Sequence, residues 1–355
     1  MICENCGKGR GIRRMKAWTK KGIKIVAAVV VGLALLDLFC FWYYNPAGYL
    51  QDESRATDVI REPGLFTSRA NEGFSWAVID ENGYNNRQVT GEDGVFVLMM
   101  GSSHTEGLYV LPGDDVSSQL GVRLRESGVD GIVYNIGTSA HHLARNISNL
   151  ERALTRFEPS GYVVIEAASV IMGRQTAYAA LDGSLKRFGA TEVVISEWIS
   201  ERPLLRTVYR QLQDLRGMGS EEGDDESAPA EASQEMLDEY MDVMTRLFQM
   251  VRDAADAHGV TPIVYYHPHL LLQEDGTAEP DTYQPFLEIY RGASEAAGVR
   301  FMDMTDVFLE TYKEEHILPH GFINTAAGTG HLNAAGNRVI AETLCAEILE
   351  QEAAK

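Results

Sequence analysis

The sequence lacks the cysteine pairs from which a disulfide framework could form. Cys3 and Cys6 precede a long apolar run, Cys40 lies inside that run, and Cys345 stands alone near the other end. No disulfide is therefore expected in the main part of the chain. Cys3 and Cys6 form a single Cys-x-x-Cys pair, whereas a tetrahedral zinc site needs four ligands. We expect a reduced pair, with a zinc ion shared between two chains as the alternative.

The sequence also has too little positive charge for nucleic-acid binding. Its net charge is −20, and phosphate binding requires a basic face. Nucleic acid is therefore not expected as a partner. The basic residues that are present gather near the N-terminus, at Lys8, Arg10, Arg13, Arg14, Lys16, Lys20, Lys21 and Lys24.

One long hydrophobic run follows this basic segment. Residues 25–44 are apolar apart from Asp37 and end in four aromatic side chains. About 20 apolar residues cross a bilayer as a helix, aromatic residues favour its interfaces, and basic residues stay on the cytoplasmic side. The pattern predicts a single-pass protein of the cell membrane, with a cytoplasmic tail at 1–24, a signal anchor in contact with lipid at 25–44, and the main domain outside. A cleaved signal peptide is the alternative, although no small-x-small cleavage site follows.

Two further segments differ in composition from the rest. Residues 45–90 form a juxtamembrane segment of mixed composition that ends in a turn signal. Residues 217–234 are acidic, small and proline-containing, with little to bury. We expect a flexible surface loop there, with a lid over the active site as the alternative.

The remaining sequence alternates between strand and helix patterns over residues 91–352. Apolar runs at 94–100, 132–136, 161–166, 260–266 and 299–303 predict buried strands, separated by helical stretches at 114–127, 142–157, 233–258 and 281–297. This alternation predicts a parallel sheet with helices on both faces. We expect a flavodoxin-like three-layer α/β/α sandwich with a five-stranded sheet. Ligands in such folds bind beyond the carboxyl ends of the strands, where Ser103, Ala140 and His267 should gather.

Two short segments far apart in the sequence carry residues suited to nucleophilic catalysis. The first reads VFVLMMGSSHTEG and places Ser103 in a turn after an apolar strand. The second reads GTGHLNAAGNRVIAE and places His331 just before a helix capped by Asn333. Serine and histidine are the parts of an activated nucleophile and its general base.

In this order the two segments resemble the SGNH/GDSL hydrolase superfamily. Residues 101–107 fit its first block, with Ser103 at the nucleophile position and Ser102 in place of the usual Asp. Residues 328–333 fit its last block, with His331 at the base position and Gly328 in place of the Asp. Residues 135–140 resemble the second block, with Ala140 at the position of a glycine. The third block, which carries an oxyanion-binding Asn, is not recognisable.

The resemblance implies an esterase or O-acyltransferase that works through an acyl group on Ser103. The backbone N–H groups of Ser103 and Ala140 would bind the oxyanion, and no cofactor is expected. His267 and His269 form a His-x-His pair, but no matching carboxylate spacing accompanies it, so no metal is expected either. Further side chains expected to line the cleft are Ser102, Asn135, Ser139, His141, His142, His267, His269 and Asn333.

The missing Asp leaves the partner of His331 open. A backbone carbonyl near Gly328 is our first hypothesis, and a carboxylate such as that of Glu106 or Glu166 is the alternative. Exported, anchored members of the superfamily often act on acyl esters of envelope polysaccharides, so a cell-envelope glycan is the expected substrate. Two alternatives to an enzyme of this kind stay open. One is a noncatalytic glycan-binding or assembly subunit, and the other is an acyl-transfer partner of a multispanning membrane acyltransferase.

Overall fold

The computed structural model describes residues 8–43, 49–51, 56–57, 59–70, 72–86, 94–170, 172, 174–185, 202–205, 207–208, 212 and 233–355. Residues 217–232 of the acidic segment lie outside this part of the chain, as do Cys3 and Cys6. Ser233 and Gln234, at the end of that segment, already belong to the start of a long helix.

The centre of the fold is the predicted five-stranded parallel sheet. Its strands are β5 (Val95–Met100), β6 (Gly131–Asn135), β7 (Tyr162–Ala167), β8 (Thr261–Tyr266) and β11 (Arg300–Asp303). They lie in the order β11-β8-β7-β5-β6, and every neighbouring pair is parallel. This is the flavodoxin-like order, so the predicted fold class is confirmed. β7 is buried at every position, as expected for a strand covered on both faces.

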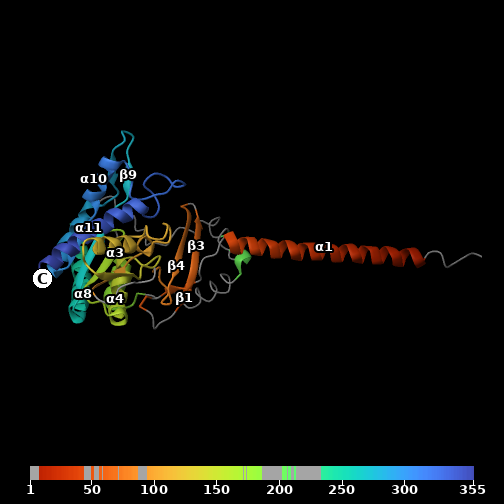
Figure 1. Ribbon diagram of the computed structural model, residues 1–355, viewed down its shortest axis with the longest axis horizontal. Coiled ribbons are helices and arrows are strands. Elements are labelled where there is room, and N and C mark those ends of the chain that lie inside the picture. The colour runs from red at the N-terminus through yellow and green to blue at the C-terminus, as the bar shows by residue number, and fades with distance from the viewer. Residues whose placement is uncertain are drawn as a thin grey trace, which may run out of the picture.

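Helices cover both faces of the sheet (Figure 1). Alternate residues of β5 point to opposite layers: Leu98 and Met100 belong to one apolar cluster, Val97 and Met99 to the other. The first layer contains α4 (Leu143–Phe157), α5 (Arg174–Asp182), α8 (Gln234–His258) and α9 (Gln284–Ala297). The second contains α3 (Val116–Glu126), α10 (Thr305–Glu315) and α11 (Ala334–Ala353).

Three of these helices begin at polar side chains that cap the first turn, and one of them, Asn333, was predicted as a cap. Asp115, Ser233 and Asn333 each accept a hydrogen bond from a backbone N–H in the first turn of α3, α8 and α11. Such caps fix where a helix starts. The loop before α11, which carries His331, therefore has a fixed end.

Several short elements lie outside the predicted pattern. They are β1 (Tyr49–Gln51) paired with β2 (Val59–Arg61), β3 (Gly64–Ala70) paired with β4 (Gly73–Ile79), and β9 (Leu270–Leu272) paired with β10 (Ala278–Pro280), all antiparallel. The β3–β4 hairpin buries Phe66, Ala77 and Ile79 against Leu108 of the main domain. Part of the juxtamembrane segment 45–90 thus packs on the domain that contains the parallel sheet.

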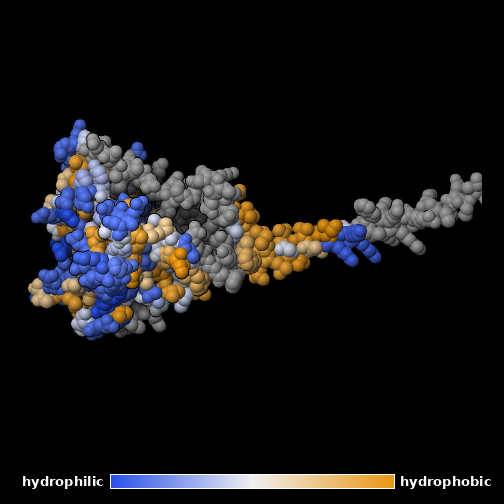
Figure 2. All heavy atoms as spheres, turned by 90° about the horizontal axis from the view of Figure 1, so that it is seen from above, coloured by the Kyte–Doolittle hydropathy of each residue, from blue (hydrophilic) through white to orange (hydrophobic). Residues whose placement is uncertain are grey.

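A single long helix, α1 (Lys8–Tyr43), extends away from this domain (Figure 1). An 18-residue window within Lys20–Phe41 has a mean hydropathy of 2.4, and hydrophobic residues form most of the surface of this stretch (Figure 2). By length and composition this stretch can cross a membrane. The same properties also fit a signal sequence.

Candidate active site

The turn after β5 places Ser103 at the carboxyl edge of the sheet. Ser102 caps a short helix, α2 (Ser103–Glu106), so the Ser103 side chain projects from the first helical position. A Cβ atom at Gly101 would overlap the hydroxyl of Thr105 and the carboxylate of Glu166. Only glycine fits at this position, which accounts for the first residue of the motif.

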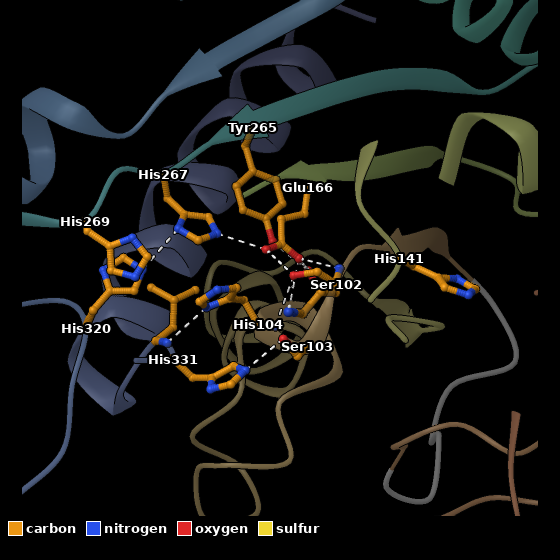
Figure 3. A network of polar contacts seen from close by, with 12 residues as sticks. Ser102, Ser103, His104, His141, Glu166, Tyr265, His267, His269, His320 and His331 are labelled. Carbon is orange, nitrogen blue, oxygen red and sulfur yellow. Dashed lines mark hydrogen bonds and ion pairs between the residues drawn. The ribbon is translucent and has the colours of Figure 1, made fainter. Parts of the chain in front are cut away.

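Ser103, His331 and Glu72 form a continuous chain of hydrogen bonds. Ser103 Oγ lies 2.8 Å from His331 Nε2, and His331 Nδ1 lies 2.7 Å from Glu72 Oε2 (Figure 3 shows the Ser103–His331 pair). The second carboxylate oxygen of Glu72 accepts the backbone N–H of His331 at 2.7 Å. This arrangement sets the tautomer, because Nδ1–H donates to the carboxylate and Nε2 is left to accept the serine proton.

The hypothesis of a carbonyl partner near Gly328 is therefore wrong. Glu72 lies in the turn between β3 and β4 and approaches His331 from 259 residues away in the sequence. Glu106 and Glu166 are not the partner either, since both are hydrogen-bonded elsewhere. The signal that was missed is the alternation of apolar and polar residues on both sides of Glu72. Interpreted as two strands, these runs predict a hairpin with Glu72 in its turn.

Gly328→Asp is expected to destabilise the protein without raising its activity. Gly328 has a φ of +76°, and a Cβ atom there would overlap the carbonyl oxygen of Leu270. A matched control is Gly276→Asp, since Gly276 has a φ of +83° but no atom near its Cβ position. The melting temperature should fall further for Gly328→Asp than for the control. Increased esterase activity in Gly328→Asp would contradict the assignment of Glu72.

Two aromatic rings hold the His331 imidazole in place. Tyr109 stacks on it with ring centroids 3.8 Å apart and planes inclined by 16°. The His104 ring lies on another side, with its centroid 5.0 Å away, and its Nδ1 accepts the backbone N–H of Leu332 at 3.1 Å. Neither residue was singled out from the sequence. Both restrict the ring to the orientation in which Nε2 faces Ser103.

Glu166, on β7, is the buried anchor of the nucleophile turn. Its carboxylate accepts the backbone N–H of Ser102 at 2.8 Å and that of Thr105 at 3.2 Å. The hydroxyls of the same two residues lie 2.9 Å and 2.5 Å away. In the superfamily that the sequence resembles, position 102 is usually an Asp. Here the position is Ser102, and the carboxylate next to it comes from Glu166 on β7.

Glu166 also begins a chain of buried imidazoles. His267 Nε2 lies 2.9 Å from Glu166, and His267 Nδ1 lies 3.2 Å from His320 Nε2 (Figure 3). Burial alone would raise the pKa of the Glu166 carboxyl, but the hydrogen bond and charge of His267 and the charge of His104 outweigh it, so that pKa lies well below its usual range. Burial and the neighbouring imidazoles lower the pKa values of His320, His104 and His269.

The side chains of this cluster do not fit a metal ion. Ligand atoms of His104, Glu166 and His267 lie within 4.8 Å of one another. However, Nδ1 of His104 accepts the Leu332 N–H, so in the neutral ring Nε2 carries the proton and has no lone pair for a metal. Nε2 of His267 likewise donates to Glu166. A metal ion would have to break both hydrogen bonds, and the cluster is better described as a scaffold for the turn.

Among the other predicted residues, two from the second block bind the nucleophile turn. Asn135 is buried and donates to the carbonyl of Thr105 at 2.7 Å. Ser139 donates its N–H to Glu106 at 3.1 Å, and its hydroxyl bonds the same carboxylate. Glu106 in turn forms a buried ion pair with Arg61 of β2, with 2.5 Å between Nε and Oε1. These contacts join the first two blocks to the N-terminal segment.

Ala140 has a φ of +63°, a conformation that favours glycine and explains the glycine usual at this position. His142 is exposed at the start of α4, and His141 is buried and lies apart from the other imidazoles (Figure 3). His269 donates to the carbonyl of Gly330 at 3.1 Å. Asn333 caps α11 and also donates to the carbonyl of Leu318 at 2.7 Å. The side chain of Asn333 is thus engaged in holding the His331 loop.

Lowering the pH below 6.5 is expected to destabilise the protein. The folded state holds the His320 and His104 imidazoles below their ordinary pKa of 6.5, so the unfolded chain binds more protons in this range. Each such imidazole should lower the free energy of unfolding by up to about 1.4 kcal/mol per pH unit. The carboxyl of Glu166 adds a loss only at still lower pH, because its pKa starts from 4.5 in the unfolded chain.

Melting temperatures of the detergent-solubilised chain at about pH 7.5 and about pH 5.5 test this expectation. His320→Leu should reduce the difference between the two, whereas His142→Leu, at an exposed position, should leave it unchanged. Equal melting temperatures for the unsubstituted protein at both pH values would show that these imidazoles are not held neutral.

No family model matches the sequence, and no curated protein matches it. Solved structures that resemble this chain include hydrolases and esterases of the SGNH/GDSL type. TesA has 16% identity and a TM-score of 0.39 over 70% of this chain and 95% of its own. An SGNH hydrolase from Slackia heliotrinireducens has 15% identity and a TM-score of 0.38, over 72% of this chain and 98% of its own. The acetyl xylan esterase AlAXEase has 14% identity and a TM-score of 0.41, over 71% of this chain and 99% of its own. At these identities and TM-scores the likeness carries no argument about the activity or substrate of this chain.

Proposed function

We propose that this chain is a serine esterase or O-acyltransferase of the SGNH/GDSL type. One observation carries the proposal: the chain of hydrogen bonds from Ser103 through His331 to Glu72, with 2.8 Å and 2.7 Å between the bonded atoms. A serine hydroxyl becomes a nucleophile when an oriented base removes its proton. The arrangement also weakens the case for a noncatalytic subunit, which the missing Asp and Asn of the motifs had favoured, because Glu72 supplies an acid.

The chemistry follows from the tautomer of His331. Nε2 takes the proton of Ser103 while Oγ attacks the acyl carbon, and the Glu72 carboxylate stabilises the imidazolium that forms. The imidazolium then gives this proton to the leaving alcohol, which leaves an acyl group on Ser103. Water or the hydroxyl of an acceptor reverses these steps. The backbone N–H groups of Ser103 and Ala140 are the proposed donors to the oxyanion.

The proposed location is the outer side of the cytoplasmic membrane, with α1 as the anchor. The basic residues in the first part of α1, between Lys8 and Lys24, and the apolar run that follows them support it. Acyl esters of a cell-envelope polysaccharide are the proposed substrate. Adding a sugar acceptor to the assay separates the two reactions, since a transferase passes its acyl group to the sugar and a hydrolase passes it to water.

Labelling with a fluorophosphonate probe tests the proposed nucleophile. The probe reacts with an activated serine, and mass spectrometry of the digested protein should place it on Ser103. Unfolding the protein before the probe is added should abolish the reaction, because activation requires His331 and Glu72. A probe found on another serine, or on none in the folded protein, would contradict the proposal.

A further inference from the structure

We propose that the outer face of the β3–β4 hairpin rests on the surface of the lipid bilayer that α1 spans. This inference rests on the proposed membrane anchoring. It adds a second contact with the membrane, made by the element that carries Glu72.

The hairpin has one buried and one exposed apolar face. Phe66 and Ala77 are 7% and 3% exposed and face the domain. Their neighbours point the other way, and the exposed fractions are 59% for Leu65, 55% for Phe74, 38% for Trp76 and 44% for Val78. Leu65 lies opposite Val78 in the strand register. A gathering of large apolar side chains on an exposed face is typical of an interaction surface.

The connection to α1 keeps this face close to the membrane. Residues 44–48 join α1 to β1, and five residues span at most about 20 Å. Only Glu62 and Pro63 separate β2 from β3. In Figure 1, β3 and β4 lie between the parallel sheet and the end of α1 and run across the axis of that helix. The exposed face is thus on the side from which the membrane span enters the domain.

A hydrogen bond within the span brings a second apolar surface to the same level. The backbone N–H of Leu204 donates to the carboxylate of Asp37 at 2.9 Å, and Asp37 lies inside the apolar stretch Lys20–Phe41. Leu205, Val208 and Leu212 follow at a helical spacing that puts them on one face, with exposed fractions of 39%, 47% and 46%.

Lipid is the occupant that fits this position. A segment bonded to the last turns of a membrane span lies at the level of the interface, where apolar side chains and tryptophan are favoured. The chain carries a net charge of −20 although its first 24 residues are basic. Apolar contact, and not attraction to anionic head groups, therefore holds the domain at the bilayer surface.

This contact has a consequence for the active site. Glu72 lies in the hairpin turn and bonds both the backbone and the ring of His331. A hairpin seated on the bilayer would hold the site at a constant, short distance from the membrane. The substrates it fits are acyl esters presented at the membrane surface, such as those of a glycan still attached to a lipid.

Spin labels on the full-length protein in phosphatidylcholine vesicles test the proposal. In a background without its native cysteines, a nitroxide is attached at Val78→Cys on the hairpin face and at Val122→Cys on α3. Val122 is the matched control for Val78, since the exposed fractions of the two side chains are 41% and 44%. A third label at Val30→Cys reports on the span. Oxygen, which concentrates in lipid, and a nickel chelate, which stays in water, are used as relaxing agents.

The label at position 78 should collide more with oxygen and less with nickel than the label at position 122, and the label at position 30 should show the strongest preference for oxygen. If position 30 is in lipid but position 78 matches position 122, the seating is refuted and the anchor stands. A protein rather than lipid would then be the occupant of this face. If position 30 is in water, the anchor and the seating both fail.

Discussion

Ser103→Ala is expected to lower kcat/KM for an activated acyl ester by about 10⁴-fold to 10⁶-fold. The loss is large because His331 and Glu72 act only through the Ser103 hydroxyl, so its removal inactivates all three. Steady-state kinetics on a short nitrophenyl ester, with the full-length protein in detergent, measures it.

Ser148→Ala is the control, since that hydroxyl bonds only a carbonyl of its own helix, 3.0 Å away. Both variants should melt at the temperature of the unsubstituted protein. A Ser103→Ala protein that keeps the original rate would exclude Ser103 as the nucleophile, whatever its distance from His331.

Glu72→Gln is expected to lower kcat by about 10³-fold to 10⁴-fold. The substitution keeps the size of the side chain but removes the charge that stabilises the imidazolium. The new amide can also donate to His331 Nδ1, which would put the ring proton on Nε2 and prevent that atom from accepting the serine proton. KM should change little, because Glu72 bonds the histidine and not the substrate.

Two variants complete this test. Glu72→Asp keeps the charge on a shorter side chain and should retain more activity than Glu72→Gln. Glu62→Gln removes a charge from an exposed position just before the same hairpin and should have no effect. If Glu72→Gln and Glu62→Gln had equal rates, the hydrogen bond to His331 would be structural only.

The sheet could be predicted from the sequence because its strands are buried on both sides. Runs such as Tyr162–Ala167 contain the apolar residues that such strands require, and the ends of all five predicted strands agree with the structure to within one residue. Ser103 and His331 could be found for a related reason. Each lies in a short motif with a second recognisable residue. Gly101 leaves room for the tight turn before Ser103, and Asn333 caps the helix after His331.

The acid of the site could not be predicted in the same way. Glu72 is 259 residues from its partner, and no local pattern around either residue indicates the other. His141 and His267 were misjudged for a different reason, since periodicity does not distinguish a buried imidazole from one that lines a cleft. His267 is fully buried against Glu166, so it shapes the nucleophile turn and does not reach a substrate.

The long separation between Glu72 and His331 also determines when the proposed active site can assemble. Glu72 is made early and His331 late, so a growing chain contains both residues only after position 331 has been added. With the proposed topology, the N-terminal part crosses the membrane while the remainder is still being synthesised or translocated. The assembled site then first exists on the outer side. With that topology, acyl esters of the cytoplasm, thioesters among them, would not meet the assembled site.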